Sequence, residues 1–182
     1  SDVYKRQLLK GAAPSCGGGI EPLLKLAFEL KDLEVVRLIL RLDDDEEAKP
    51  GLDLINGREL ALQWACRSGL HDFVSELIRS EKVELDDRDA APLLLASDQG
   101  HTDVINVLLR AEVDVNQACK DGQTALLKAS CNGHVRVVTA LLDAKAECNK
   151  ADKKGNTPLD LACRNGHSRV VTHLLKAMES IK

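Results

Sequence analysis

Aromatic side chains are scarce in this chain, with four among 182 residues, although 44% of the residues are apolar. Because aromatic rings supply much of the bulk of a thick core, we expect thin layers of helices packed through Leu, Val and Ala. No apolar run approaches the roughly 18 residues that a membrane-spanning helix needs. The first residues do not resemble a secretory signal either. The sequence therefore predicts no membrane insertion and a cytoplasmic location, with the nucleus as an alternative.

An excess of positive charge is also missing, since the net charge is −4 and the pI is about 5.7. A general nucleic-acid binder needs surplus Lys and Arg to neutralise phosphates, so no nucleic-acid partner is expected. The six cysteines include no Cys-x-x-Cys pair and no zinc-type Cys/His cluster. Cys66 and Cys163 occupy one slot in repeats too far apart for a disulfide. Ser97 and Ser130 fill that slot elsewhere, so we interpret these cysteines as small packing residues.

Sequence signatures of catalysis are absent as well. There is no Gly-rich phosphate loop, nucleophile elbow or metal-binding His pair. His101, His134 and His167 recur in one slot after a helix end, where we expect them to hydrogen-bond the turn rather than act as bases. The acidic run Asp43–Glu47 lacks the pattern of a calcium loop. It is interpreted as a solvated loop, with a contact for a basic partner as the alternative. We therefore predict no enzyme activity, no metal and no cofactor.

What the sequence does contain is an internal repeat. The segment Ala96–His101 returns as Ala129–His134 and as Ala162–His167, in steps of 33 residues. A degenerate copy, Ala65–Leu70, lies 31 residues upstream of the first, and a weaker one begins at Ala27. A constant period of this size indicates a solenoid of stacked units rather than a globule around one pocket.

Each repeat predicts two helices. In the last one, Thr157 supplies an N-cap hydroxyl, Pro158 starts the first helix, and Gly166 ends it in a left-handed conformation. A second helix follows, with an apolar stripe at four, five, eight and nine residues past that glycine. The stripe recurs in every repeat as Val170, Val171, Leu174 and Leu175; Val137, Val138, Leu141 and Leu142; Val104, Ile105, Leu108 and Leu109; Phe73, Val74, Leu77 and Ile78; and Val35, Val36, Ile39 and Leu40.

Asp121–Leu126, Lys154–Leu159, the Gly-His pairs and Val113–Asn116 resemble the ankyrin repeat family. The resemblance implies an all-α ankyrin solenoid of about five units, at residues 20–50, 55–85, 86–118, 119–151 and 152–182, read as one domain. Two slots depart from the family pattern. Leu94, Leu127 and Asp160 replace the usual His after the Pro position, and Ala91, Leu60 and Pro22 replace the Thr.

Both ends of the chain depart from the repeat pattern. Ser1–Gln7 has no relation to the repeats, and Gly17–Gly19 follow it, so residues 1–19 are expected to be a disordered or foreign tail. In the last repeat Val170, Leu174 and Met178 keep an apolar stripe, and no polar-faced closing unit follows. We therefore expect a monomer, or part of a longer array, because solenoids need polar end units for solubility.

In the ankyrin fold, the hairpin tips and the first helix of each unit line a groove that binds other proteins, and the tip of the second unit is expected at Asn56 and Glu59. Helical spacing points to the same face, since Leu159 and Ala162 turn to the core while Leu161, Arg164 and Asn165 do not. The residues predicted to contact a partner protein or peptide are Trp64, Arg67, Asp87, Arg88, Asp98, Gln99, Lys120, Gln123, Lys128, Asn132, Lys153, Lys154, Asn156, Arg164 and Asn165.

Two hypotheses refine this surface. Asp86, Asp87, Asp89 and Asp98 crowd the third unit while Lys153, Lys154 and Arg164 gather in the fifth, so a peptide of opposite polarity would be oriented by charge. Ordinary solubilising charges are the alternative.

Trp64 occupies a slot filled elsewhere by Leu26, Leu95, Leu161 and Lys128. It is either a core residue or an interface hot spot.

One modification is also predicted. Leu108 followed by Asp114-Val115-Asn116 resembles the pattern that hypoxia-linked asparagine hydroxylase recognises in ankyrin repeats, with Asn149 a weaker equivalent of Asn116. An Asn that orders the turn between units is the alternative, and the two interpretations are compatible.

The sequence thus predicts a protein-binding scaffold. The competing hypotheses are a regulatory ankyrin module of a larger enzyme, ligase adaptor or channel, and a purely structural spacer.

Overall fold

The computed structural model describes residues 24, 25, 27, 36, 54–79 and 91–179. Contacts divide the chain into two compact units, residues 1–64 and 65–182, and the boundary falls inside one helix. The described residues form helices α4 to α11 and no strand. Predictions for residues 1–19, for most of the first repeat, and for Asp86, Asp87, Arg88 and Asp89 lie outside the described residues.

Helix α4, Leu54–Ser68, has 15 residues and crosses the boundary between the units. It is longer than predicted, because Asn56 and Glu59 were expected at a hairpin tip and both lie within the helix. The physical reason is a missing start signal: Leu60 stands where the fourth and fifth repeats have the capping residues Thr124 and Thr157, so no side chain there favours beginning a helix. The helix therefore extends upstream.

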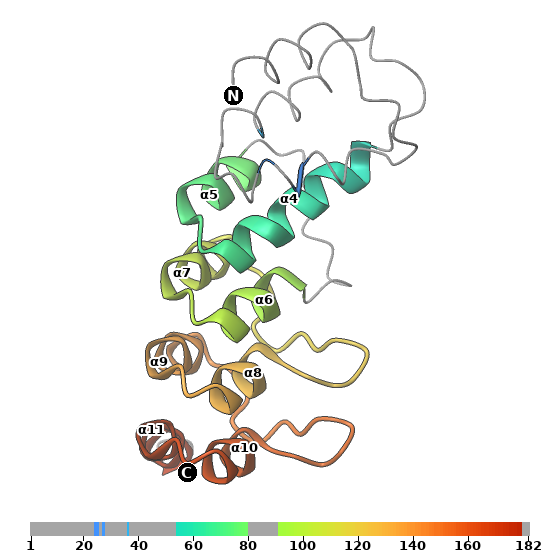
Figure 1. Cartoon of the computed structure of the whole chain (residues 1–182). Helices are drawn as coiled ribbons and strands as arrows, with labels where there is room; N and C mark the ends of the chain where they lie inside the picture. Colours follow the sequence, from blue (N-terminus) through green and yellow to red (C-terminus); the bar gives the residue numbers. More distant parts are fainter. Residues whose placement is uncertain (1–23, 26, 28–35, 37–53, 80–90, 180–182) are drawn as a thin grey trace, which may run out of the picture. The chain divides into compact units, whose positions relative to one another are not determined.

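Seven helices of the second unit form two layers (Figure 1). One layer contains the first helices of the repeats, α6 (Ala91–Gln99), α8 (Ala125–Cys131) and α10 (Pro158–Arg164). The other contains α5 (His71–Arg79), α7 (Thr102–Arg110), α9 (Val135–Asp143) and α11 (Ser168–Glu179). Helix α8 contacts α6 and α10, while α9 contacts α7 and α11. The predicted all-helical solenoid is confirmed for these repeats.

Two long connections link α7 to α8 and α9 to α10, and both project beyond the layer of α8 and α10 (Figure 1). We call them the fourth-repeat hairpin, residues 112–124, and the fifth-repeat hairpin, residues 145–157. In the former, the Cys119 amide donates to the Gln123 carbonyl at 3.0 Å. Both begin with a residue in the left-handed region, Glu112 at φ 59° and Lys145 at φ 68°. The hairpins thus present short, hydrogen-bonded tips beside the first helices.

The predicted helix caps are confirmed. Thr124 accepts a hydrogen bond from the Leu127 amide at 3.3 Å, which satisfies one of the unpaired amides at the start of α8. Thr157 and Asp160 form a reciprocal capping box at the start of α10, with Pro158 in the first turn. The hydrogen bonds from Thr157 hold the pKa of the Asp160 carboxyl below its usual range. Asp160, which departs from the family pattern, therefore stabilises the helix start.

The core consists of the apolar stripes of the second helices. Val104, Ile105 and Leu108 are fully buried, as are their equivalents Val137, Val138 and Leu141. Each such side chain contributes about 1.5–3 kcal/mol by leaving water. Val170 and Leu174 of the last repeat are also fully buried, and α11, which carries them, packs against α9 and α10. Met178 is half-buried.

A histidine contact recurs between consecutive repeats. The Nε2 atoms of His101, His134 and His167 lie 2.9, 3.0 and 2.9 Å from the carbonyl oxygens of Arg67, Asp98 and Cys131. Because a carbonyl can only accept, Nε2 carries the proton in each contact. The predicted turn-bonding role is confirmed, but the bonded turn belongs to the preceding repeat. Each imidazole therefore joins two repeats.

The glycine that ends each first helix is required by this contact as well as by its own conformation. Gly133 has φ 75°, which disfavours any residue with a Cβ, and a Cβ there would also lie 2.5 Å from Nδ1 of His167. Gly166 has the same φ of 75°, but a Cβ there would meet nothing within 4 Å. Both glycines share the left-handed backbone, but only Gly133 has an imidazole in contact with it. Substitutions at the two positions can therefore distinguish the cost of the backbone strain from the cost of displacing the ring.

A buried slot on the first helices holds a hydroxyl without a hydrogen bond. The hydroxyls of Ser97 and Ser130 are buried and have no partner among the described residues. Cys66 fills the same slot, and burial raises the pKa of its thiol to about 12, so it remains an uncharged packing residue. Cys163, the fourth occupant, is exposed instead. The five described cysteines are all free, as predicted.

We predict that Gly133→Ala destabilises the protein more than Gly166→Ala. Both variants strain a left-handed backbone by roughly 1–2 kcal/mol, but only Gly133→Ala also displaces the His167 ring. The expected difference is about 1 kcal/mol or more in the free energy of unfolding, measured by urea denaturation followed by circular dichroism. Equal losses in the two variants would show that the imidazole contact contributes nothing measurable.

We also predict that Ser130→Cys stabilises the protein, because it replaces an unbonded buried hydroxyl with the weakly polar thiol that Cys66 places in this slot. The expected gain in unfolding free energy is roughly 1 kcal/mol. Ser68→Cys, at an exposed position, is the matched control and should change stability by less than about 0.5 kcal/mol. A loss of stability in Ser130→Cys alone would mean that the slot is fitted to oxygen.

Candidate functional site

The sequence predicted a binding surface at the ends of the first helices and at the hairpins. In the structure these positions lie at the ends of α4, α6, α8 and α10 and on the two hairpins. We call this surface the inner face. It contains Arg67, Asp98, Gln99, Lys120, Gln123, Lys128, Asn132, Lys153, Lys154, Asn156, Arg164 and Asn165. The first helices of successive repeats lie side by side, so residues one period apart form rows across this face (Figure 1). Trp64 lies half-buried on the part of α4 that belongs to the first unit.

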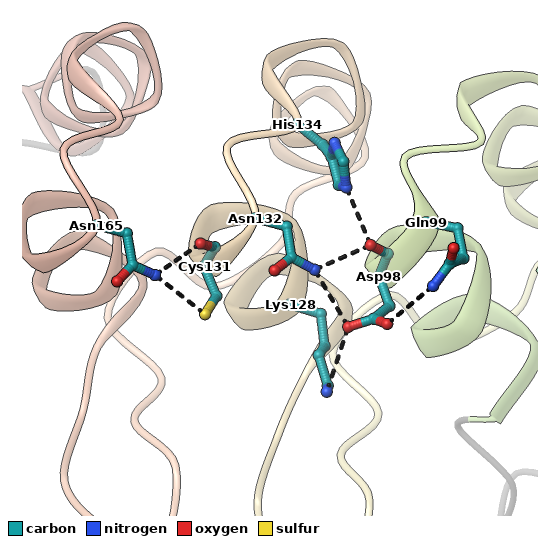
Figure 2. A network of polar contacts seen from close by, with 7 residues as sticks. All are labelled: Asp98, Gln99, Lys128, Cys131, Asn132, His134 and Asn165. Carbon is teal, nitrogen blue, oxygen red and sulfur yellow. Dashed lines mark hydrogen bonds and ion pairs between the residues drawn. The ribbon is translucent and has the colours of Figure 1, made fainter.

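The centre of the inner face is a polar network between the third and fourth repeats (Figure 2). Asp98 at the end of α6 forms an ion pair with Lys128 of α8, whose Nζ lies 3.3 Å from Oδ1. The Asn132 amide donates to the same Oδ1 at 3.2 Å, and Gln99 donates to Oδ2 at 3.2 Å. Lys128 fills a slot that holds Leu95 and Leu161 elsewhere, and Asp98 explains why a cation is accommodated there.

The environment of Asp98 favours its charged form. Partial desolvation acts to raise the pKa of this carboxyl, but the charge of Lys128 and hydrogen bonds from Lys128, Asn132 and Gln99 outweigh it. The pKa therefore lies below its usual range. Both side chains keep about a third of their surface exposed, at 34% for Asp98 and 33% for Lys128. The pair is consequently screened by solvent and contributes modestly to stability.

A second row of contacts fixes the spacing of the repeats. The Asn132 side chain donates to the carbonyl of Asp98 at 2.9 Å, and the Asn165 side chain donates to the carbonyl of Cys131 at 2.7 Å. These carbonyls are the ones that also accept from His134 and His167. Sequence reasoning placed Asn132 and Asn165 on the binding surface but missed this bonding role. The recurrence of Asn-Gly-His in two repeats is the signal that could have revealed it.

The fifth-repeat hairpin is fixed by Asp152 and Asn156. The Asp152 carboxylate accepts hydrogen bonds from the Asn156 side chain and from the amides of Asn156 and Lys154, at 2.9–3.2 Å. These bonds hold the pKa of Asp152 below its usual range, with the Asn156 side chain as the main cause. The Asn156 oxygen accepts from Nη2 of Arg164 at 3.1 Å. Three predicted site residues, Lys154, Asn156 and Arg164, are thus brought together here.

Asn116 joins the two hairpins. Its side-chain oxygen accepts from the Glu147 amide at 2.8 Å, and its carbonyl accepts from the Lys150 ammonium at 2.9 Å. Its own amide donates to the Asp114 carboxylate at 2.9 Å. These bonds correspond to an Asn that orders the turn between repeats. Hydroxylation of Asn116 stays a prediction.

The inner face is lined by polar and charged side chains. Among the residues that the structure describes, no group of three or more His, Cys, Asp or Glu side chains could hold a metal ion. None of the described helices combines the length and apolar character required to cross a bilayer. Its polar groups are instead arranged in rows of amides, carboxylates and cations.

We predict a pH-dependent coupling between Asp98 and Lys128. In a double-mutant cycle of Asp98→Asn and Lys128→Gln, the coupling should be about 0.2–1 kcal/mol near pH 7. Because the pKa of Asp98 is lowered on folding, this stability is present above the carboxyl's unfolded pKa. It is lost as the pH falls through the folded value, below pH about 4. Urea titrations at several pH values measure it, and a coupling that shows no decline as the pH falls further below about 4 would contradict the ion-pair assignment.

Comparison with known proteins places these features in a family. A family model described as ankyrin repeats (3 copies) matches residues 23–119 and again residues 93–182. The chain is also 34% identical over 67 residues to the ankyrin repeat and KH domain-containing protein mask of Drosophila melanogaster. That match covers 35% of this chain and only 2% of the fly protein. Because the family matches extend over most of the chain and agree with the stacked helix pairs, the chain belongs to the ankyrin repeat family.

Proposed function

We propose that this chain binds a partner protein or peptide through the inner face and acts as a non-catalytic scaffold. Ankyrin repeats are generally protein–protein interaction modules. The observation that carries the proposal is the doubled contact at the last two repeat junctions, where one carbonyl accepts from both an Asn and a His of the next repeat. This bonding keeps the rows of the inner face in a fixed register.

A fixed register matters for binding because association loses less entropy when the surface is already ordered. The hairpins meet the same requirement, since Asp152 and Asn156 bond the turn on which Lys154 lies. The backbone that carries these side chains is already ordered before a partner binds, so association does not have to order it. The scaffold proposal thus rests on preorganisation, with specificity supplied by the polar and charged side chains of the inner face.

A second candidate is a regulatory repeat module within a larger enzyme, ligase adaptor or channel. The fly relative favours it in one respect, because its name combines ankyrin repeats with a KH domain and the match covers only 2% of its length, so similar repeats occur there within a longer protein. In this case the inner face would bind a partner, or another domain of the same protein, on behalf of an activity located elsewhere. Transcripts that encode an additional catalytic or membrane domain would favour this candidate over a free-standing scaffold.

We predict that reversing the charges of Lys153, Lys154 and Arg164 to Glu removes specific partners in affinity enrichment from cell extract. The three side chains are exposed on the inner face, so their reversal should disturb binding without disturbing the core. Parallel enrichments with the natural chain and the variant, read by quantitative mass spectrometry, give the set of proteins lost.

The matched control reverses Arg136, Arg169 and Lys176, which are exposed on the outer helices α9 and α11. It changes the net charge equally and leaves the inner face intact. Proteins retained by the control but lost with the inner-face variant are the expected result. If both variants and the natural chain recover the same proteins, the inner face is not the working surface.

A further inference from the structure

The charge of the chain is unevenly distributed between its repeats. Residues 119–182 contain 11 Lys and Arg against six Asp and Glu, whereas residues 1–118 contain 14 against 23. The fourth and fifth repeats are therefore basic in a chain whose net charge is −4. A basic region in a protein of negative net charge acts mainly by orienting charged partners, and less by keeping the protein soluble.

Part of this positive charge lies at the tips of the two hairpins. Lys120, Lys153 and Lys154 are exposed there. The amide of Lys153 donates to the carbonyl of Asp121 at 3.1 Å, so the two tips are joined by a backbone hydrogen bond. Gly122 lies close against the same backbone, where a Cβ would come within 3.0 Å of the Lys153 nitrogen. The backbone that carries the three lysines is thus held together before any partner arrives.

The acidic residues that the structure describes near these lysines form no ion pair with them, although the charge of Lys154 contributes to lowering the pKa of Asp152. Asp152 directs its carboxylate to the amides of Lys154 and Asn156 and to the Asn156 side chain, within its own turn. Asp121 is exposed beside them. In the part of the chain that the structure describes, Lys120, Lys153 and Lys154 form no ion pair, whereas Lys128 is paired with Asp98. The tips therefore keep cationic groups available to a ligand.

We propose that the joined hairpin tips bind an acidic segment of a partner protein, a stretch of consecutive Asp or Glu side chains that contacts Lys120, Lys153 and Lys154. This inference rests on the proposed function and specifies the chemistry of the partner. Arg164 extends the cationic surface toward α10, because its guanidinium donates to Asn156 at the base of the same hairpin. An extended acidic peptide across the tips would pass from one repeat to the next.

A protein ligand fits these observations better than a nucleic acid. The chain has only four aromatic residues, and the hairpins 112–124 and 145–157 contain none on which bases could stack. Asp121 and Asp160 interrupt the positive charge near the tips, which weakens a continuous path for phosphates. The flexible Asp and Glu side chains of a peptide can turn away from these two positions, whereas the regularly spaced phosphates of a nucleic acid cannot.

The test uses the full chain and a fluorescein-labelled oligoglutamate peptide, with binding followed by fluorescence anisotropy at about 50 mM and 150 mM salt. The variant carries Lys120→Gln, Lys153→Gln and Lys154→Gln. Its matched control carries Arg136→Gln, Arg169→Gln and Lys176→Gln on the outer helices. We expect the hairpin variant to weaken binding about tenfold or more and the control to weaken it less than about twofold.

Equal losses in the hairpin variant and the control would overturn the proposal, since they would reveal a general charge effect. Absence of binding by the natural chain would overturn it too, as would a single-stranded oligonucleotide of matched charge that binds more tightly than the peptide. The experiments distinguish failure of the acidic-ligand proposal from failure of the scaffold proposal. Partners lost from the charge-reversed variant in affinity enrichment, combined with no oligoglutamate binding, would retain the scaffold and reject the acidic ligand.

Discussion

The contact of one imidazole with the turn of the preceding repeat is the interaction on which the second unit depends. The carbonyl that receives the His ring lies in the last turn of a first helix, where carbonyls lack an intrahelical partner, and the glycine beside it leaves space for the ring. The same geometry recurs at three junctions, from Arg67 to Cys131. Each repeat is thereby placed relative to its neighbour, and the apolar stripes of the second helices meet in register.

The inner face follows from that register. Asn132 and Asn165 donate to the carbonyls that the histidines already contact, so side chains of the inner face also hold the repeats together. Polar residues on such a surface consequently divide into two groups. Asp98, Lys128, Asn132 and Asn165 are bonded between repeats, while Lys120, Lys153 and Lys154 at the hairpin tips extend to solvent. Ligand recognition in our proposal belongs to the second group.

Much of the fold could be predicted because its signals are local. The Thr157 cap, the position of Pro158 and the left-handed Gly166 each depend on neighbouring residues, and the structure contains all three. The start of α4 could not be predicted in the same way. The period suggested a hairpin around Asn56 and Glu59, but without a capping residue at Leu60 the helix begins at Leu54. Similarly, the stripe of the last repeat was identified correctly, while the burial of Val170 and Leu174 depends on α9.

The sequence by itself determined the repeat, its family and the rows of residues on each helix face, because period and capping chemistry are written along the chain. Only the tertiary structure decided which members of a row bond to the next repeat. Asp98 and Lys128 are 30 residues apart, and nothing local indicates that a carboxylate of one helix compensates a cation in a slot used by leucine. Likewise, the joining of Lys153 to Asp121 follows from stacking of the repeats, which brings two hairpin backbones within hydrogen-bonding distance.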